Sequence, residues 1–282
     1  MYKAEFVSDK GLSYLFGSEG HTAFSMDVGN GMSVNLGISQ GFSQVGEFVD
    51  SQSIGGKPIS VKGVVYGNVE QKKNELRNAF APFTSGKLIF NKTHFIRVYV
   101  EESPTFSARK GDGRFTMLLY APKPLFQNIT ESVYKIGEIQ PLFSFPVNYS
   151  EKHIFGKTVS PGFAMILNNG DVPVPLQISL MFHADCKNPK ITDNKNLKFF
   201  KLNGTFSAGS VVNIYRDDFG ILKVVQESEE NSQDIINMVD EDSDFFEITV
   251  GSNPISVTAD VGSGSIETII KFNESVVSVY ET

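Results

Sequence analysis

The chain has few of the residues on which several common kinds of protein chemistry depend. It contains one cysteine, Cys186, and no tryptophan in 282 residues. A single cysteine excludes a disulfide framework and any site built from several thiolates. No run of about 20 apolar residues occurs, so the sequence predicts no transmembrane helix and no membrane insertion. Glu5 stands where an export signal needs an apolar run, so we expect a chain made in a reducing cytoplasm.

An excess of basic residues is also missing. Residues 1–140 contain 15 Lys and Arg against 13 Asp and Glu, a net charge of +2, whereas residues 141–282 contain 10 against 19, a net charge of −9. Because nucleic-acid binding depends on clustered Lys and Arg, nucleic acid is not expected as a partner. The different balance of the two halves indicates two domains in different surroundings.

Motifs for enzymatic chemistry are absent. The four histidines are far apart and none has the spacing His-Glu-x-x-His, and neither a Gly-x-x-x-x-Gly-Lys-Ser/Thr phosphate loop nor a Gly-x-Ser-x-Gly elbow occurs. His183 and Cys186 are three residues apart but lack a second pair of ligands, which favours a buried thiol. A hydrolase that degrades cell walls would need an acid pair or a zinc set, and no such set is distinguished.

The densest acidic run, residues 240–244, does not match a calcium loop. Counted from Asp240, the positions that require glycine and glutamate in an EF-hand hold Phe245 and Gly251. The run therefore predicts a solvated acidic turn. We expect no catalytic residue, no cofactor and no metal.

Strand-like segments account for most of the chain. They recur at intervals of roughly ten residues with turn residues between them, which is typical of sandwiches and barrels rather than of alternating strands and helices. The clearest are residues 59–66, 94–100 and 114–120, and the others are 162–167, 176–182, 198–202, 211–215, 221–226, 245–250, 255–259, 265–272 and 275–280. The predicted fold class is mainly β.

One segment, residues 68–83, has the pattern of an amphipathic helix packed on a β-domain. Asn68 is the expected N-cap, with Gln71 as its capping-box partner. An apolar stripe follows at intervals of seven, four and three residues: Val69, Leu76, Phe80 and Phe83. A short turn or helix is also predicted over residues 232–239. Prolines cluster in residues 121–145, which predicts a linker between domains at 1–140 and 141–282.

Phenylalanine is abundant, with 24 residues, and many lie beside small residues in turn-like segments. Exposed apolar groups of this kind often form interfaces, although ordinary packing beneath loops is the alternative. In the segment 31–57 we predict a self-association surface that contains Phe42 and Phe48.

Two ordered sets of motifs carry a family resemblance. The first set runs through residues 57–126, with a strand, a helix that ends in a Pro and Gly-x-Leu segment, and a closing Pro-x-Phe stretch. The second set contains N-x-G-D-x-P-x-P-L-x-I at residues 168–178, NP-x-I at 188–191, and D-S-x-F-F-x-I with G-x-N-x-I at 242–255. Together they resemble the distal tail proteins (Dit) of long-tailed siphophages.

The resemblance implies a fold and a role. It implies an N-terminal β-domain with one packed helix and a galectin-like C-terminal β-sandwich. It further implies a homohexameric ring at the virion tail tip, joining the tail tube protein to the tail-associated tip protein, with receptor-binding proteins on the outer domains. Prophage and tailocin particles fit equally well. Such a structural hub is not an enzyme.

A second function class, a carbohydrate-binding module that contacts host cell-wall saccharides, stays open through the galectin-like domain. Saccharide sites usually stack a sugar on an aromatic ring, and tryptophan is absent. Tyr149, Tyr215 and Phe219 are the substitutes that the second half offers.

Overall fold

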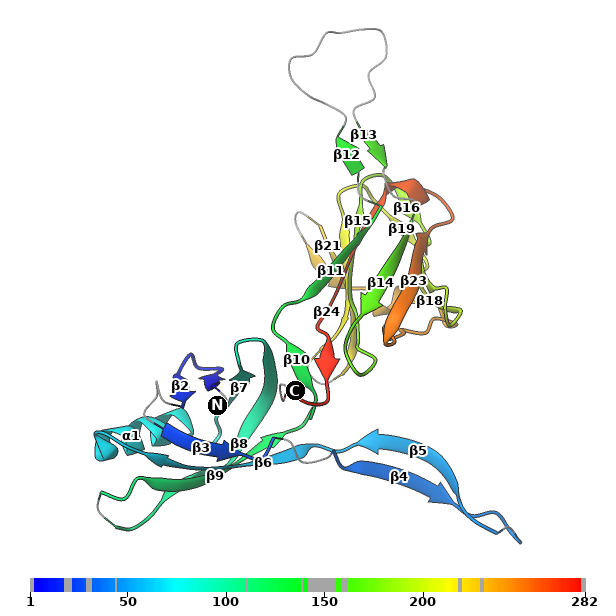
Figure 1. The fold of residues 1–282 in the computed structure, drawn as a ribbon. Coiled ribbons are helices and arrows are strands. Elements are labelled where there is room, and N and C mark those ends of the chain that lie inside the picture. Colours follow the sequence, from blue (N-terminus) through cyan, green and yellow to red (C-terminus); the bar gives the residue numbers. More distant parts are fainter. Residues whose placement is uncertain are drawn as a thin grey trace, which may run out of the picture. The chain divides into compact units, whose positions relative to one another are not determined.

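The computed structural model describes residues 3–17, 22–28, 32–43, 45–109, 111–137, 139–141, 156–158, 162–217, 220–228 and 231–279. Most of the regular structure in these residues is β-strand, and it contains one α-helix (Figure 1). It forms two compact units, one of Met1–Thr130 with Ser275–Thr282 and the other of Glu131–Glu274. The units thus divide between residues 130 and 131 rather than between 140 and 141, and the C-terminal segment belongs to the first unit.

The first unit is built on one antiparallel sheet. Its strand order is β2 (Ser13–Phe16), β1 (Ala4–Ser8), β7 (Ser85–Phe90), β8 (His94–Phe106), β9 (Arg114–Ala121), β6 (Lys57–Val65) and β3 (Thr22–Met26). Two short strands, β10 (Phe126–Asn128) and β25 (Ser275–Val276), extend it beside β8. The segments 59–66, 94–100 and 114–120, predicted as strands, lie in β6, β8 and β9.

Helix α1 (Val69–Ala79) lies within the segment predicted to be helical. The predicted capping box is wrong, because the side chain of Asn68 makes no capping bond and instead donates from Nδ2 to Gln71 Oε1 at 3.0 Å. Leu76 and Phe80 are fully buried, as the stripe predicts, but Phe83 is 99% exposed. The stripe fails there because the helix ends before Phe80 and the chain then turns away.

An aromatic cluster fastens α1 to the sheet. The rings of Phe6 on β1 and Phe80 stack with centroids 4.4 Å apart, and Tyr14 and Phe16 from β2 pack around Phe80. Tyr14 shares a 2.8 Å hydrogen bond with Thr22 Oγ1, and burial raises the pKa of the Tyr14 hydroxyl. Apolar contacts thus hold the helix on the sheet. The polar group of the four rings, the hydroxyl of Tyr14, is hydrogen-bonded.

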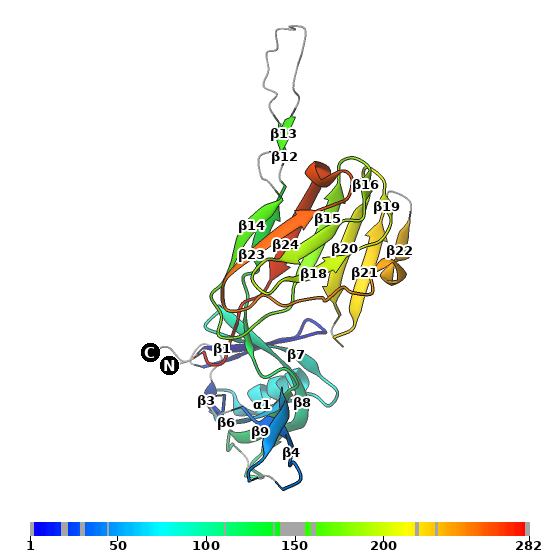
Figure 2. The ribbon, with the colours of Figure 1, turned by 90° about the vertical axis from the view of Figure 1, so that its right-hand side faces the viewer.

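The second unit is a β-sandwich (Figure 2), as predicted. One sheet has the order β11 (Ser132–Ile136), β24 (Ile266–Phe272), β15 (Gln177–Phe182), β20 (Val211–Arg216), β21 (Leu222–Glu227) and β22 (Ser232–Asp234). The other has β14 (Phe163–Asn168), β23 (Gly251–Thr258), β17 (Lys190–Asp193) and β18 (Lys198–Lys201). Two small ribbons accompany them: β16 (Cys186–Lys187) with β19 (Thr205–Phe206), and β12 (Ile139–Pro141) with β13 (Gly156–Thr158).

Three expectations about this unit need correction. Residues 132–136, expected in a linker, form β11 and pair with β24, because the prolines flank this segment without entering it. Residues 232–239 begin as β22 and only then form a 3-10 turn at Ile236–Met238. Residues 245–250 contain no strand, although Phe245, Phe246 and Ile248 are buried.

Buried asparagines explain the motifs of the second half. Asn168 donates from Nδ2 to the carbonyls of Val172 (3.0 Å) and Ile248 (3.1 Å). Asn253 likewise donates to the carbonyls of Thr249 (2.7 Å) and Gly251 (2.8 Å). A carboxamide can satisfy backbone groups that a loop leaves unpaired, and each motif asparagine therefore fixes one connection between the sheets.

Thr268 breaks the apolar pattern of β24. Its side chain is fully buried between the inward positions of Ile266 and Ile270, and its Oγ1 has no hydrogen-bond partner among the described residues. We expect Thr268→Val to raise the free energy of unfolding of this unit by about 1 kcal/mol, since valine keeps the shape and removes the unpaired hydroxyl. Urea denaturation followed by circular dichroism measures the change.

Thr249→Val is the matched control. Thr249 Oγ1 donates to Asn253 Oδ1 and accepts from Lys195 Nζ, both at 2.7 Å, so the same exchange there should lower the free energy of unfolding by about 1 kcal/mol. An equal loss in both variants would show that the hydroxyl of Thr268 is paired after all.

Candidate assembly interface

Residues that could carry chemistry are engaged in structural contacts. His183 pairs with Glu267 through a 3.0 Å Nε2–Oε2 contact, whereas Cys186 is buried and burial raises the pKa of its thiol to about 11. The two residues form no common site. In the described part of the chain, no three His, Cys, Asp or Glu side chains are grouped so that they could hold a metal. Among those residues no helix is long and apolar enough to span a membrane.

The acidic run 240–244 is a turn held by lysines of β18. Asp240 Oδ2 accepts from Asn203 Nδ2 at 3.0 Å and lies 3.4 Å from Lys201 Nζ, and Asp244 lies 2.6 Å from Lys198 Nζ. Hydrogen bonds to its carboxylate, first that from Asn203, lower the pKa of Asp240. The carboxylates are used to anchor the turn to the sandwich.

The most unusual feature of the first unit is a two-stranded arm. Strands β4 (Val34–Ser39) and β5 (Phe48–Ile54) pair only with each other in the described structure. Figure 1 shows them extending away from the main sheet of this unit. We call residues 32–56 the arm. Every residue of β5 is exposed, and so are all those of β4 except the half-buried Gly37.

The arm has one apolar face that nothing in its own unit covers. Directly opposed residues share a face of a ribbon, and three such pairs are Val34 with Ile54, Leu36 with Gln52, and Ile38 with Val49. The five apolar members are each 48–53% exposed. The other face is mainly polar, with Asn35 opposite Ser53 and Ser39 opposite Phe48.

The two residues predicted for self-association both belong to the arm. Phe42 lies in the turn at its tip and is 102% exposed, and Phe48 is 55% exposed on the mainly polar face. Neither residue therefore lies on the five-residue apolar face. The sequence reasoning did not predict that face. The alternation of apolar and small or polar residues in 34–39 is the signal that could have revealed it.

The base of the arm is held firmly. Lys57, at the start of β6, is buried, and its Nζ donates to the carbonyl of Val28 at 2.6 Å. Burial lowers the pKa of Lys57, while the nearby Asp27 acts in the opposite direction. This bond ties the segment that enters the arm to the strand that leaves it. Gly56 lies against Tyr120 so closely that a Cβ would collide with the ring.

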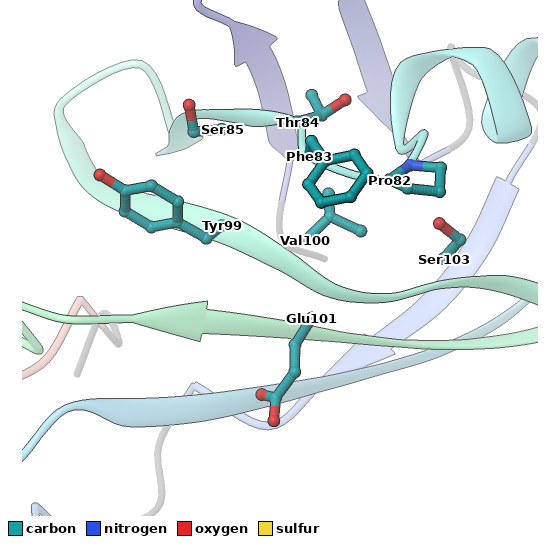
Figure 3. Close-up of a pocket in the computed structure, with 8 residues that line it drawn as sticks. All are labelled: Pro82, Phe83, Thr84, Ser85, Tyr99, Val100, Glu101 and Ser103. Atoms are coloured by element: carbon teal, nitrogen blue, oxygen red, sulfur yellow. The ribbon is translucent and has the colours of Figure 1, made fainter.

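A groove of about 660 Å³ opens beside the end of α1 (Figure 3). Phe83 projects there fully exposed, and Tyr99 on β8 contributes a ring that is 44% exposed. Phe83 follows Pro82 in a turn closed by a hydrogen bond from Thr84 N to Ala81 O (3.2 Å), and its φ is 63°. That position of a type II turn normally holds glycine, because a side chain is strained there.

A second hollow, of about 450 Å³, lies at α1 and the end of β8. We call it the cationic pocket. Arg77 and Lys73 from α1 lie over the ring of Phe106, with the charged groups 4.8 and 5.7 Å from its centroid. Arg109 completes the positive lining, and Glu70 is the acidic residue of the lining, 3.2 Å from Lys73.

The aromatic residues considered for saccharide stacking are not brought together. Tyr215 is half-buried on β20, opposite Lys223 of β21. Tyr149 and Phe219 lie outside the described residues.

Comparison with known proteins shows which families and structures this chain is similar to. Residues 169–275 match the family model described as siphovirus-type tail component, C-terminal domain. The structure is similar to the Dit protein (gp 19.1) of phage SPP1, described as a paradigm of the hub adsorption apparatus in phages that infect Gram-positive hosts. That match has a TM-score of 0.65 and 14% identity, and covers 98% of this chain and 99% of the other.

A chain of the phage P2 baseplate, in its activated conformation with Ca, is similar with a TM-score of 0.50 and 10% identity. It covers 99% of this chain and 100% of that one. The sequence matches none of the curated proteins with which it was compared. Identities this low show a shared fold. The family match lies within the second unit, which is similar to the siphovirus-type tail components, and the whole chain has the fold of the SPP1 Dit protein, in agreement with the resemblance to distal tail proteins.

Proposed function

We propose that this protein is the structural hub of a siphophage-type tail tip, in a virion or in a prophage or tailocin particle. Six copies form a closed ring. The first units join the tail tube protein to the tail-associated tip protein, and the second units face outward and hold receptor-binding proteins. The family match of the second unit and the fold shared with the SPP1 Dit protein support this role.

The observation that carries the ring is the uncovered apolar face of the arm. Burying a Val, Leu or Ile side chain completely stabilises by about 1.5–3 kcal/mol, so covering the remaining half of one contributes on the order of 1 kcal/mol. Five such side chains on each arm contribute on the order of 5 kcal/mol in total to a contact that repeats around a ring, before the cost of association is met.

The arm is also suited to a head-to-tail contact between copies. A projection on one side of a subunit that binds a different surface on the next makes a heterologous contact, and such contacts form a ring when the rotation closes. A closed six-fold ring suits a phage tail, because such a ring can be coaxial with the tail tube. This arrangement uses no catalytic group.

The mass of the purified protein in solution tests the ring. We expect light scattering behind size exclusion to give six times the 31.1 kDa of one chain, and negative-stain images to show annular particles. The tail tube protein, when added, should bind to one side of the ring and leave the ring intact. A monomer that stays monomeric at high concentration and with the tube protein present would contradict the proposal.

Charge on the apolar face should prevent assembly. We expect Ile38→Asp with Val49→Asp to convert the ring to monomers, because two carboxylates would have to be desolvated in the contact. Phe42→Asp with Phe48→Asp should weaken assembly less, since these residues lie at the tip and on the other face. The Ile38 and Val49 pair should lower the free energy of unfolding of the monomer by about 1–2 kcal/mol, because the two aspartates lie directly opposite each other on the ribbon.

The matched control is Asn35→Asp with Ser53→Asp on the mainly polar face of the same arm. These changes add the same charge and should leave the mass of the particle unchanged. Equal disruption by the two pairs would show that net charge, and not the apolar face, governs assembly.

We expect Phe83 to lower the stability of the monomer and to strengthen its binding to another protein chain. Phe83→Gly removes a strained φ and an exposed ring, so we expect the thermal stability of the monomer to stay equal or rise by about 1 kcal/mol. Binding between copies or to a neighbouring tail protein should weaken, because the groove loses its most exposed aromatic group. Unchanged binding, measured by light scattering and by pull-down with the tail tube protein, would show that Phe83 has no partner there.

A further inference from the structure

The charges of the arm are all of one sign. Among residues 32–56 only Glu47 and Asp50 are ionisable acids, and there is no Lys or Arg. Both are exposed, Glu47 at the tip and Asp50 at the register shift in β5. The arm is therefore apolar along one face and negatively charged near its tip. A surface that binds it needs positive charge where the tip lies.

The cationic pocket has the opposite charge. Lys73, Arg77 and Arg109 line it against the single acid Glu70. Glu70 is already held by Lys73 and by a hydrogen bond from the backbone of Gly111, which together lower its pKa. In the described part of the chain, neither Arg77 nor Arg109 takes part in an ion pair, and both are exposed.

The pocket and the arm lie at opposite ends of the same sheet. The register of β6 and β9 pairs Lys57 with Ala121 at the end where the arm leaves, and Val64 with Arg114 at the other. The cationic pocket lies at this other end, where Phe106 of β8 pairs with Phe115 of β9. Seven steps of about 3.3 Å separate the ends by roughly 23 Å. Figure 1 shows the same placement, with α1 and the β4–β5 ribbon on opposite sides of this unit.

This geometry prevents an easy contact within one chain. The segment Val34–Phe42 reaches roughly 26 Å at about 3.3 Å per residue, and it starts from a base that Lys57 holds in place. The arm therefore points away from the pocket of its own unit, so a contact between arm and pocket requires a second copy of the chain. A head-to-tail contact of this kind is what a closed ring needs.

We propose that the cationic pocket receives the tip of the arm of a second copy, with Arg77 and Arg109 facing Glu47 and Asp50. This inference rests on the proposed ring and names its contact. Solvent-exposed ion pairs add little to affinity, so their role is to select the direction and register of the contact, while the apolar face supplies its strength.

Charge reversal with complementation tests the contact. One variant carries Glu47→Arg and Asp50→Arg, and the other Arg77→Glu and Arg109→Glu. Each alone meets like charge at every contact, so the concentration for half-maximal assembly should rise at least about tenfold. A mixture of the two meets only opposite charges when the copies alternate, and it should recover the hexamer mass.

The quadruple variant, with all four reversals in one chain, should also assemble. The matched control is Lys135→Glu with Lys187→Glu, which reverses two exposed lysines of the second unit and should leave assembly unchanged. Rings that form equally well from each variant alone, or a mixture that does not recover, would overturn the contact and leave the ring itself standing.

Disulfide trapping reports the contact even where the ring is weak. Cys186 is buried, so introduced cysteines are the reactive ones. Oxidation of a mixture of Glu47→Cys and Arg109→Cys proteins should give a covalent dimer on a non-reducing gel, in clear excess over a mixture of Glu47→Cys and Lys135→Cys. Equal yields would reject the contact. Trapping without a hexamer would keep the contact and reject the ring.

Discussion

A two-stranded ribbon has no interior, and the arm of this protein has to be understood from that constraint. Its five half-exposed apolar side chains cannot be buried by folding the ribbon more tightly, because the partners on both strands already lie on the same face. Only another surface can cover them. In the rest of the first unit, the aromatic cluster around Phe80 packs α1 on the sheet, and Lys57 ties the start of β6 to the backbone of Val28, just before the arm.

The second unit solves the opposite problem. Its two sheets enclose their own apolar core, and Asn168 and Asn253 satisfy backbone carbonyls where the chain passes between elements. Even the acidic run 240–244 is tied down by Lys198 and Lys201. A domain that encloses its apolar core in this way needs no second copy to cover it. Residues 141–282 carry a net charge of −9, so copies of this half repel one another electrostatically.

Much of the fold could be predicted because the pattern of β6, β8, β9 and α1 repeats over enough residues to be recognised, and because the family motifs are local. The failures have physical causes. Phe83 continues the helical spacing of Leu76 and Phe80, but the spacing has no meaning once the chain leaves the helix. Residues 132–136 look like part of a linker because prolines surround them, whereas their pairing with β24 is a contact across the sequence. The phenylalanines led to the prediction of a self-association surface in residues 31–57, but not of an arm. The face opposite Phe48 is the more apolar one, since the register shift between Gly37 and Ile38 decides which residues share a face.

The receiving surface could not have been predicted at all from one sequence. Arg77 lies in a helix and Arg109 in the connection between β8 and β9, and only the packing of α1 beside the end of β8 brings them into the lining of one pocket. Both guanidinium groups are exposed and neither is in an ion pair among the described residues, although Arg77 lies over the ring of Phe106. Charges that contribute little to the fold of a subunit can still determine which way round its copies meet. In a ring, every contact must have the same orientation. The apolar face of the arm supplies the strength of that contact, and the charges of the pocket select its direction.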